Sequence, residues 1–336
     1  MSDGRLVFLT GATGYIGSRL ARRLVERGDR IRCLVRPTSN ASALEELGAE
    51  IVVGELTDAA TIVGALQDVD LAVHLAAVYE VGVVDRRALE RTNVLGTRTF
   101  LSAIERARTP RAIYVSTTAA LAPVPDGEGD EDTEYGPGAR YPSVYHETKA
   151  RAHSMAREAQ RIGLPLIIVC PAVVYGPGDR SPMGKYVEDL IAGRLPGLLT
   201  RDPWFSYVHV DDVVEGMLLA ADKGRTGRTY IFSGEHASLS DFLGRVADIA
   251  GKRLPRLRFP VGLARATGIG LDLISRITGL RFPISREAVD VGAGHRWLHS
   301  NARAREELGW NPRPLAEGLP EYVRWFVDQR ARRRGR

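Results

Sequence analysis

Runs of apolar residues alternate with amphipathic segments along the first half of the chain. Apolar runs predict β-strands near residues 5–10, 30–35, 49–53, 69–75, 111–117 and 165–170. The segments between them carry apolar positions at helical spacing. This alternation is typical of a parallel sheet whose strands are joined by right-handed helical crossovers. We therefore expect an α/β fold with a doubly wound parallel sheet, followed by a smaller, mostly helical C-terminal part.

Two helices and one loop stand out within this pattern. The amphipathic pattern from Arg86 to Arg108 stops before a proline, and a second pattern from Ser143 to Ile162 stops at a glycine. Residues 122–142 are rich in proline, glycine and acidic residues, which predicts a surface loop where an active-site flap would sit.

The segment 259–283 is rich in Leu, Ile and Gly and has few charges. Three roles are open for such a helix. It could line an apolar pocket, pack on its own domain, or approach a membrane surface, and packing is the commonest role of apolar helical spacing.

Glycines follow the first predicted strand at intervals of three residues. Gly11 permits a tight turn, Gly14 lets the backbone approach a pyrophosphate, and Gly17 allows close packing of the next helix. Phosphates bind well at a helix N-terminus that follows such a turn. The strand, turn and helix predict a Rossmann-type dinucleotide site, although glycines at such a turn can also be purely structural.

The end of the second strand bears on the choice of nucleotide. NAD sites commonly place an acidic residue there, whereas this chain has Arg36. A guanidinium makes paired, charge-assisted hydrogen bonds to a 2′-phosphate, so the residue favours NADP, with NAD still possible. Alternatively, Arg36 ends the strand in solvent. Glu55, after the third strand, could accept a hydrogen bond from the adenine amino group or could be a loop carboxylate.

Tyr145 and Lys149 form the second candidate constellation. They lie four residues apart at the start of a predicted helix, and so on one helical face. A nearby ammonium would lower the pKa of a phenol from about 10 towards working pH. Thr117, at the end of a strand, would hydrogen-bond the same substrate oxygen. These three residues predict proton exchange during interconversion of an alcohol and a carbonyl, with a nicotinamide carrying the hydride. A Tyr–Lys pair alone is more often a surface contact.

These motifs together resemble the extended short-chain dehydrogenases/reductases of the NAD(P)-dependent epimerase/dehydratase superfamily. Residues 10–17 are similar to the family's cofactor turn, 74–77 to the segment that passes the nicotinamide, and 170–179 to the loop that folds over it. The resemblance implies that Thr117, Tyr145 and Lys149 are catalytic, with Lys149 also anchoring the ribose. The cofactor contacts that we expect are Gly11, Thr13, Gly14, Tyr15, Ile16, Gly17, Arg36, Glu55, Leu56, Leu75, Ala76, Ala77, Tyr145, Lys149, Pro171 and Val174.

Two positions depart from the family pattern. Cys170 stands where an arginine is often found. Phe205 stands where nucleotide-sugar members have the arginine that holds the diphosphate. A buried diphosphate without a paired cation would be costly, so an apolar substrate is favoured. The alternative is that a shifted loop lets Arg201 or Arg194 hold the diphosphate.

Composition and charge narrow the class of protein. The chain has 336 residues, 44% of them hydrophobic, and no segment long and apolar enough to span a bilayer. The first residues offer no signal-peptide hydrophobic region, and this favours a cytoplasmic location. Cys33 and Cys170 lie in apolar strands and are expected to be reduced core residues, with no metal site. Much of the net charge of +5 lies in the tail 330–336, which lacks interleaved aromatic residues, so we expect no nucleic-acid partner.

The sequence therefore predicts an NADP-dependent oxidoreductase that interconverts a ketone and a secondary alcohol on an apolar small molecule, similar to the dihydroflavonol-reductase and 3β-hydroxysteroid-dehydrogenase branches. A nucleotide-sugar epimerase or dehydratase with tightly bound NAD and a non-catalytic NADP-binding protein are the alternatives. The resemblance also implies a homodimer, formed by the two long helices within 86–108 and 143–162. The expected domains are residues 1–175 with 205–232 returning to them, for the dinucleotide, and 176–204 with 233–336, for the substrate.

Overall fold

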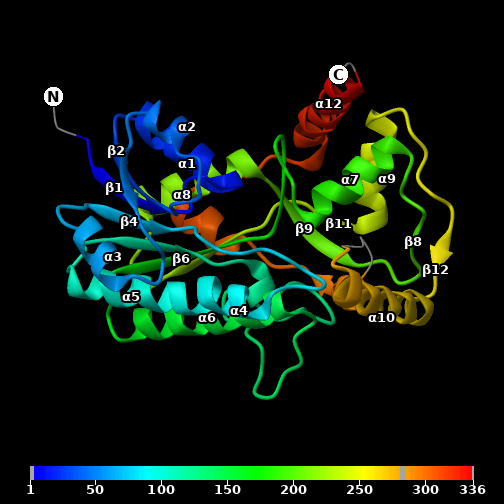
Figure 1. Ribbon diagram of the computed structural model, residues 1–336, viewed down its shortest axis with the longest axis horizontal. Coiled ribbons are helices and arrows are strands. Elements are labelled where there is room, and N and C mark those ends of the chain that lie inside the picture. The colour runs from blue at the N-terminus through cyan, green and yellow to red at the C-terminus, as the bar shows by residue number, and fades with distance from the viewer. Residues whose placement is uncertain (1–3, 281–284, 335–336) are drawn as a thin grey trace.

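The computed structural model describes residues 4–280 and 285–334 (Figure 1). Residues 281–283 of the predicted apolar segment and residues 335–336 of the arginine-rich tail lie outside the described residues.

A parallel sheet with the strand order β10-β6-β5-β4-β1-β2-β3 forms the larger half of the molecule (Figure 1). The predicted strands are confirmed, with ends that differ by at most a few residues, and β10 was not predicted. The strands are β1 (Leu6–Thr10), β2 (Arg30–Val35), β3 (Glu50–Val53), β4 (Leu71–His74), β5 (Ala112–Val115), β6 (Leu166–Pro171) and β10 (Thr229–Phe232). Apolar runs of this kind are typical of strands that are buried on both faces.

Helices cover both faces of this sheet because successive strand residues point to opposite sides. Val7 and Leu9 of β1 pack in one core with Leu20 of α1 (Tyr15–Glu26) and Val213 of α8 (Val210–Lys223). Phe8 packs in the core on the other face. That face carries α3 (Ala59–Ala65), α5 (Thr97–Arg106) and α6 (Val144–Arg161), and the short α2 (Ser42–Glu45) follows β2. The doubly wound sheet is therefore confirmed.

The first predicted long helix contains a change of winding. It begins as α4 (Arg86–Leu89), continues as the π-helical segment η1 (Glu90–Gly96) and ends as α5. The second is α6, whose N-cap Ser143 accepts a hydrogen bond from the His146 amide. π-Helical segments of this length often mark functional sites, which directs attention to the side chains of η1.

The loop 122–142 follows the short 3-10 helix η2 (Thr118–Ala120) and is irregular, as predicted. It is tied to the C-terminal part instead of standing free as a flap. The Gly129 amide donates to the Leu298 carbonyl, and the Val124 amide donates to the Arg296 carbonyl. The buried Glu131 carboxylate accepts a hydrogen bond from the Ile231 amide.

The smaller part contains short strands as well as helices. β9 (Trp204–His209) pairs with β7 (Val173–Tyr175), β11 (His236–Ser238) and β13 (Arg296–Trp297), and β8 (Leu198–Leu199) pairs with β12 (Arg258–Phe259). Its helices are α7 (Pro182–Ala192), α9 (Leu239–Ile249), α10 (Val261–Thr278), α11 (Arg286–Gly292), the π-helical η3 (Ala304–Leu308) and α12 (Leu315–Arg334). Aromatic residues such as Tyr207 and Phe242, stacked at 4.1 Å, fill its core.

Two further expectations concern the cysteines and the absence of a membrane-spanning segment. Cys33 and Cys170 are both buried as free thiols. Among the described residues, none of the helices has both the length and the apolar character that crossing a bilayer requires.

Candidate active site

The glycine turn after β1 has the geometry that its spacing predicted. Gly11 has φ +76°, and a Cβ there would lie 2.7 Å from the Ala76 nitrogen. A Cβ at Gly17 would lie 2.1 Å from the Gly11 carbonyl oxygen, and one at Gly14 would lie 3.1 Å from the same oxygen. The turn is therefore folded back on itself so tightly that Gly11 and Gly17 leave no room for a side chain.

The N-terminus of α1 is open. Its N-cap residue, Gly14, provides no side-chain hydrogen bond, whereas serines cap α6, α7 and α9. Thr13 and Gly14 are exposed, and Tyr15 and Ile16 of the first turn are half-buried. Backbone amides at such an end, with the positive pole of the helix, suit a phosphate. The residues present therefore fit a dinucleotide pyrophosphate.

Residues predicted for the adenosine half lie at the ends of the next strands. Arg36 follows β2, is exposed, and its guanidinium makes no hydrogen bond or ion pair with any residue described in the structure. Glu55 is also exposed. Leu56 packs against Gly96, where a Cβ would come within 2.3 Å of its side chain. Arg36 is thus available to bind an anionic group of a ligand, whereas the Leu56 side chain packs on Gly96.

Buried hydrogen bonds hold the segment 74–77, which is predicted to pass the nicotinamide. The Thr10 hydroxyl lies 2.7 Å from His74 Nδ1, and it accepts a hydrogen bond from the Ala76 amide at 3.3 Å. Burial, with the charge of Lys149, lowers the pKa of His74 to about 3, so this histidine is neutral. Leu75 and Ala76 remain half-buried and Ala77 exposed. These residues therefore line the carboxyl edge of the sheet, where α/β folds bind ligands.

The predicted loop over the nicotinamide begins at the end of β6. Pro171 is buried, while Val174 is half-buried in β7. The Tyr15 hydroxyl donates to the Gly176 carbonyl at 2.8 Å, and the Arg19 guanidinium donates to the Pro177 carbonyl. The first helix thus fixes this loop beside the glycine turn.

Tyr145 and Thr117 come together at the same edge of the sheet. Tyr145 is buried in the first turn of α6, and its ring packs on Tyr79 at 4.6 Å. The Thr117 hydroxyl interacts with the Tyr145 phenol and lowers its pKa, but burial has the larger effect and raises that pKa above the ordinary value. The phenol is therefore protonated at neutral pH.

Lys149 lies on the same face of α6 but is turned away from the phenol. Its ammonium donates to the Tyr114 hydroxyl at 3.2 Å and to the Val115 carbonyl at 3.1 Å. In this structure the lysine charge is directed to these groups of β5, and burial, not the lysine, sets the direction of the Tyr145 pKa shift.

The neighbours of Thr117 have other partners. Ser116 is buried, and its hydroxyl lies 2.9 Å from Nδ1 of His153 in α6. Thr118 is buried in η2. Of these consecutive hydroxyl residues, Thr117 is therefore the one whose side chain meets Tyr145.

Two positioning residues were missing from the sequence prediction. The Asn93 side chain, in η1, accepts from the Val78 amide at 2.8 Å and donates to the Val78 carbonyl at 3.0 Å. Glu287 of α11 accepts from the Gly82 amide at 3.0 Å and from the Val144 amide at 3.2 Å. They hold the two ends of the segment that carries Tyr79. No local signal marks Glu287, because its α6 partner is 143 residues distant.

Phe205 itself supplies no cation at the position of the family's diphosphate-binding arginine, and the neighbouring Arg296 lies over the Trp204 ring at 5.6 Å. Phe205 is buried in the core of the smaller part, and Arg194 is held by Asp189 at 3.0 Å. Arg201 is exposed beside Gly294. Of the two arginines proposed as substitutes, Arg201 is therefore the one that is not engaged by a carboxylate.

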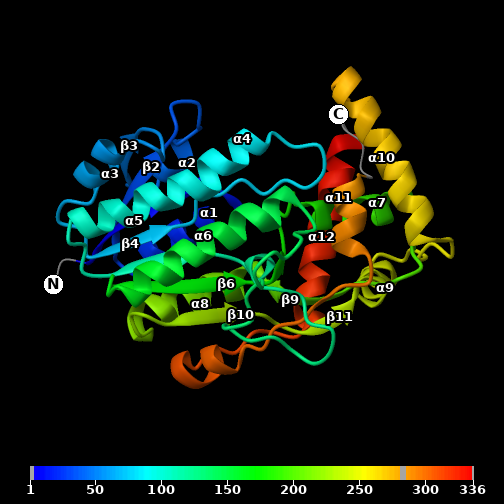
Figure 2. The ribbon, with the colours of Figure 1, turned by 90° about the horizontal axis from the view of Figure 1, so that it is seen from below.

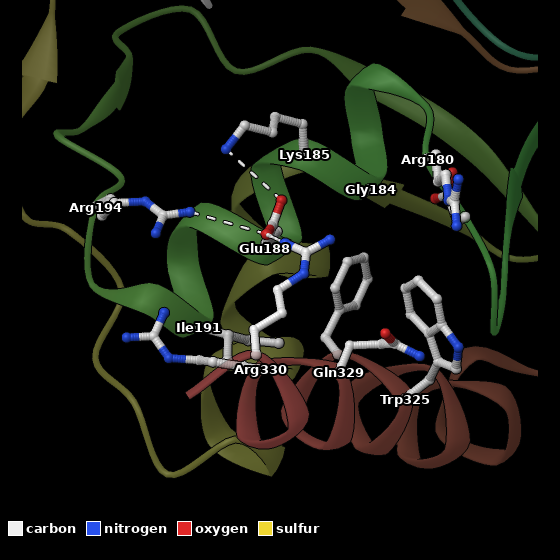
Figure 3. A pocket seen from close by; sticks show the side chains of 12 residues that line it. Arg180, Gly184, Lys185, Glu188, Ile191, Arg194, Trp325, Gln329 and Arg330 are labelled. Atoms are coloured by element: carbon white, nitrogen blue, oxygen red, sulfur yellow. Dashed lines mark hydrogen bonds and ion pairs between the residues drawn. The ribbon is translucent and has the colours of Figure 1, made fainter. Parts of the chain in front are cut away.

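A cavity of about 620 Å³ lies between α7 and α12, away from the glycine turn and Tyr145 (Figure 3). The side chains that line the cavity include several cations and an aromatic ring, those of Arg180, Lys185, Arg194, Arg330 and Trp325. Glu188, which also lines the cavity, forms ion pairs with Lys185 and Arg194. None of the predicted catalytic or cofactor residues lines this cavity. We therefore assign it no part in the candidate site.

Comparison with known proteins agrees with this architecture. A model of the NAD dependent epimerase/dehydratase family matches residues 7–232. Sterol demethylase protein B of Methylococcus capsulatus is 33% identical over 96% of this chain and 98% of its own length. A 4-hydroxy-2-methyl-3-oxo-4-farnesyl-3,4-dihydroquinoline-1-oxide ketoreductase of Stigmatella aurantiaca is 31% identical over 90% of this chain and 91% of its own.

A solved structure shows the same fold. A nucleoside-diphosphate-sugar epimerase from Pseudomonas aeruginosa superposes with a TM-score of 0.77 at 26% identity, covering 97% of this chain and 98% of that one. The expected Rossmann-type fold, with a smaller C-terminal part that is largely helical, is thereby confirmed. The chain belongs to the NAD dependent epimerase/dehydratase family and is an enzyme of the extended short-chain dehydrogenase/reductase type.

Proposed function

We propose that this enzyme uses NADPH to reduce a ketone to a secondary alcohol on an apolar small molecule. The observation that carries the proposal is the meeting of the Thr117 hydroxyl with the buried Tyr145 phenol at the sheet edge beside the glycine turn. A carbonyl oxygen placed between these two hydroxyls would receive two hydrogen bonds. NADPH, when bound, supplies the hydride.

The protonated state of Tyr145 suits the proton donor that ketone reduction needs. Burial raises the pKa of the phenol, so its proton is retained at neutral pH and is available to the substrate oxygen as negative charge develops there. Alcohol oxidation needs the opposite state, a phenolate that accepts a proton. We propose that Lys149, held beside β5 by Tyr114 and Val115, anchors the cofactor ribose.

The nature of the substrate is inferred from Phe205 and from the relatives. Phe205 fills the core where the family's arginine would bind a diphosphate, so this position offers no cation. One relative is named as a sterol demethylase protein and another as a ketoreductase of a farnesyl-bearing quinoline, both apolar systems. We infer an apolar ketone, bound next to Tyr79, whose ring packs tilted against that of Tyr145.

The organisation of the chain follows the same proposal. Residues 1–175 and 205–232 would hold the dinucleotide, and 176–204 and 233–336 the substrate. We propose a homodimer formed by the helices within 86–108 and 143–162.

The test is a nucleotide titration, after asking whether denaturation of the purified protein releases any nucleotide. We expect none to be released, and NADPH to bind about 10- to 100-fold more tightly than NADH, as charge-assisted hydrogen bonds to a 2′-phosphate imply. Arg36→Ala should remove that preference. Arg30→Ala, an equally exposed arginine at the other end of β2, should keep it.

A second candidate is a nucleotide-sugar epimerase or dehydratase with retained NAD. The exposed Arg201 and the structural similarity to a nucleoside-diphosphate-sugar epimerase favour it. Two results would replace the reductase proposal with this one. The first is tightly held NAD that is released only on denaturation. The second is thermal stabilisation by a UDP- or dTDP-sugar that is lost in Arg201→Ala.

A further inference from the structure

The outward face of α10 is apolar. Its large aliphatic side chains point to solvent, and Ile277 is the most exposed among them, at 77%. The exposed aliphatic residues are Leu263, Ile269, Leu273, Ile274, Ile277 and, just after the helix, Leu280. Figure 2 shows α10 at the outer edge of the molecule, beyond α11 and far from the large sheet. Large contiguous apolar surfaces are uncommon on proteins that do not use them.

The polar side of α10 faces the protein. The Arg265 guanidinium pairs with Asp290 of α11 at 3.0 Å, and the Asp272 carboxylate accepts from the Arg286 amide at 3.1 Å. A Cβ on Gly268 would lie 2.7 Å from the same amide, so the helices pack closely on this side. Packing on its own domain therefore uses Arg265 and Asp272 of α10 and leaves its exposed aliphatic residues without a partner among the described residues.

Unpaired cations precede this apolar face. Lys252, Arg253, Arg256 and Arg258 are all exposed, and none of them forms an ion pair with a described residue. The exposed Leu257 stands among them. Residues 250–271 contain no aspartate or glutamate. The surface thus combines a stripe of aliphatic side chains with a strip of positive charge.

We propose that α10 and the preceding segment 252–258 form a docking surface for a membrane that contains anionic lipids. The aliphatic side chains would enter the interface with the helix parallel to the membrane, and the cations would meet lipid phosphates. Each lysine or arginine near an anionic membrane adds to the attraction. A second copy of this chain fits less well, because it would bring an equally cationic surface to this one, whereas anionic headgroups complement its charge.

The docking surface is connected to the candidate active site. α11, on which α10 packs, carries Glu287, and this carboxylate contacts Gly82 and Val144 beside Tyr145. In a molecule bound through α10, α11 would lie directly behind the helix that meets the lipid. Vesicle binding requires no turnover and is therefore independent of the proposed function.

The experiment is cosedimentation of the full-length protein with large vesicles. One set is pure phosphatidylcholine and the other contains about 30% phosphatidylglycerol, a fraction that gives a strongly negative surface. We expect binding to the anionic vesicles, weakened by salt, and at least tenfold weaker binding for Leu273→Ser/Ile277→Ser and for Arg253→Glu/Arg256→Glu/Arg258→Glu. Ile162→Ser changes an equally exposed aliphatic residue at the end of α6 and should leave binding unchanged.

Thermal unfolding and nucleotide binding of each variant show that it is folded. Absence of binding to anionic vesicles by the unchanged protein would overturn the proposal, as would equal loss with Ile162→Ser. If Leu273→Ser/Ile277→Ser instead converts a dimer to a monomer in solution without affecting vesicle binding, the face is a contact between copies and the lipid proposal is wrong.

Discussion

Helices α6 and α10 have the same length, 18 residues, and bury opposite kinds of surface. α6 turns its alanines and its functional side chains to the sheet and shows charged residues to solvent. α10 turns Arg265 and Asp272 to its neighbour and shows leucine and isoleucine to solvent. An amphipathic pattern defines two faces, but the neighbouring element decides which face is covered. α6 has a sheet beside it, whereas within the described part of the chain α10 packs mainly on the short helix α11.

The largest effect is expected on the inward face of α6. Tyr145→Phe removes the proton donor and keeps the ring that packs on Tyr79. We expect kcat for ketone reduction to fall about 100- to 10,000-fold, as for other general acids, with NADPH binding unchanged. Steady-state kinetics and a nucleotide titration measure both. Tyr186→Phe in α7 is the control, and turnover retained by Tyr145→Phe would exclude the proposed role.

The same substitution in the two helices compares their faces directly. Ala156 of α6 is fully buried, so Ala156→Leu should lower the free energy of unfolding by about 1–3 kcal/mol through overpacking. Ala266 of α10 is exposed, and Ala266→Leu should change it by less than about 0.5 kcal/mol. Denaturant unfolding measures both. Equal losses would show that the outward face of α10 is packed in solution.

Glu287 connects the two helices, since it belongs to the partner of α10 and accepts from the first amide of α6. Loss of a capping acceptor costs about 1 kcal/mol. We expect Glu287→Ala to lower the free energy of unfolding by about this amount and to lower kcat, because the segment next to Tyr145 loses its anchor. Glu287→Gln keeps one acceptor oxygen, so its stability and kcat should lie between those of the unchanged protein and of Glu287→Ala. A variant with unchanged kcat and stability would remove Glu287 from the site.

The smallest expected effect is a pH dependence. Burial raises the pKa of Glu287 above the ordinary glutamate value. The folded chain therefore holds this proton more tightly than the unfolded chain does, and the contribution of Glu287 to stability falls as the pH rises through the interval between the two pKa values. The free energy of unfolding is measured across that pH interval for the unchanged protein and for Glu287→Gln. We expect it to fall with rising pH more in the unchanged protein than in the variant. A constant difference would show that the carboxylate does not titrate in this way.

The parallel sheet was predictable because its strands are buried on both faces and read as continuous apolar runs. The strands of the smaller part were not, since β7 is Val173–Tyr175 and depends on a partner in β9 that is distant along the chain. The glycine turn and the Thr117–Tyr145 pair carry local signals. Glu287 carries none, because its role exists only after α11 has folded against α6. For α10, the spacing of its apolar residues indicated an amphipathic helix, but it could not show which face the neighbouring helix would cover.

The two anchors of the segment after β4 have a consequence for redesign. Asn93 holds the backbone of Val78 and Glu287 holds that of Gly82, so the stretch 79–81 is bounded by fixed points that belong to other elements. Exchanges within such a bracket leave the backbone anchors on either side in place, although Tyr79 also packs on Tyr145. New ketone specificities should therefore be easiest to obtain from a small library at these positions, with Asn93 and Glu287 kept constant.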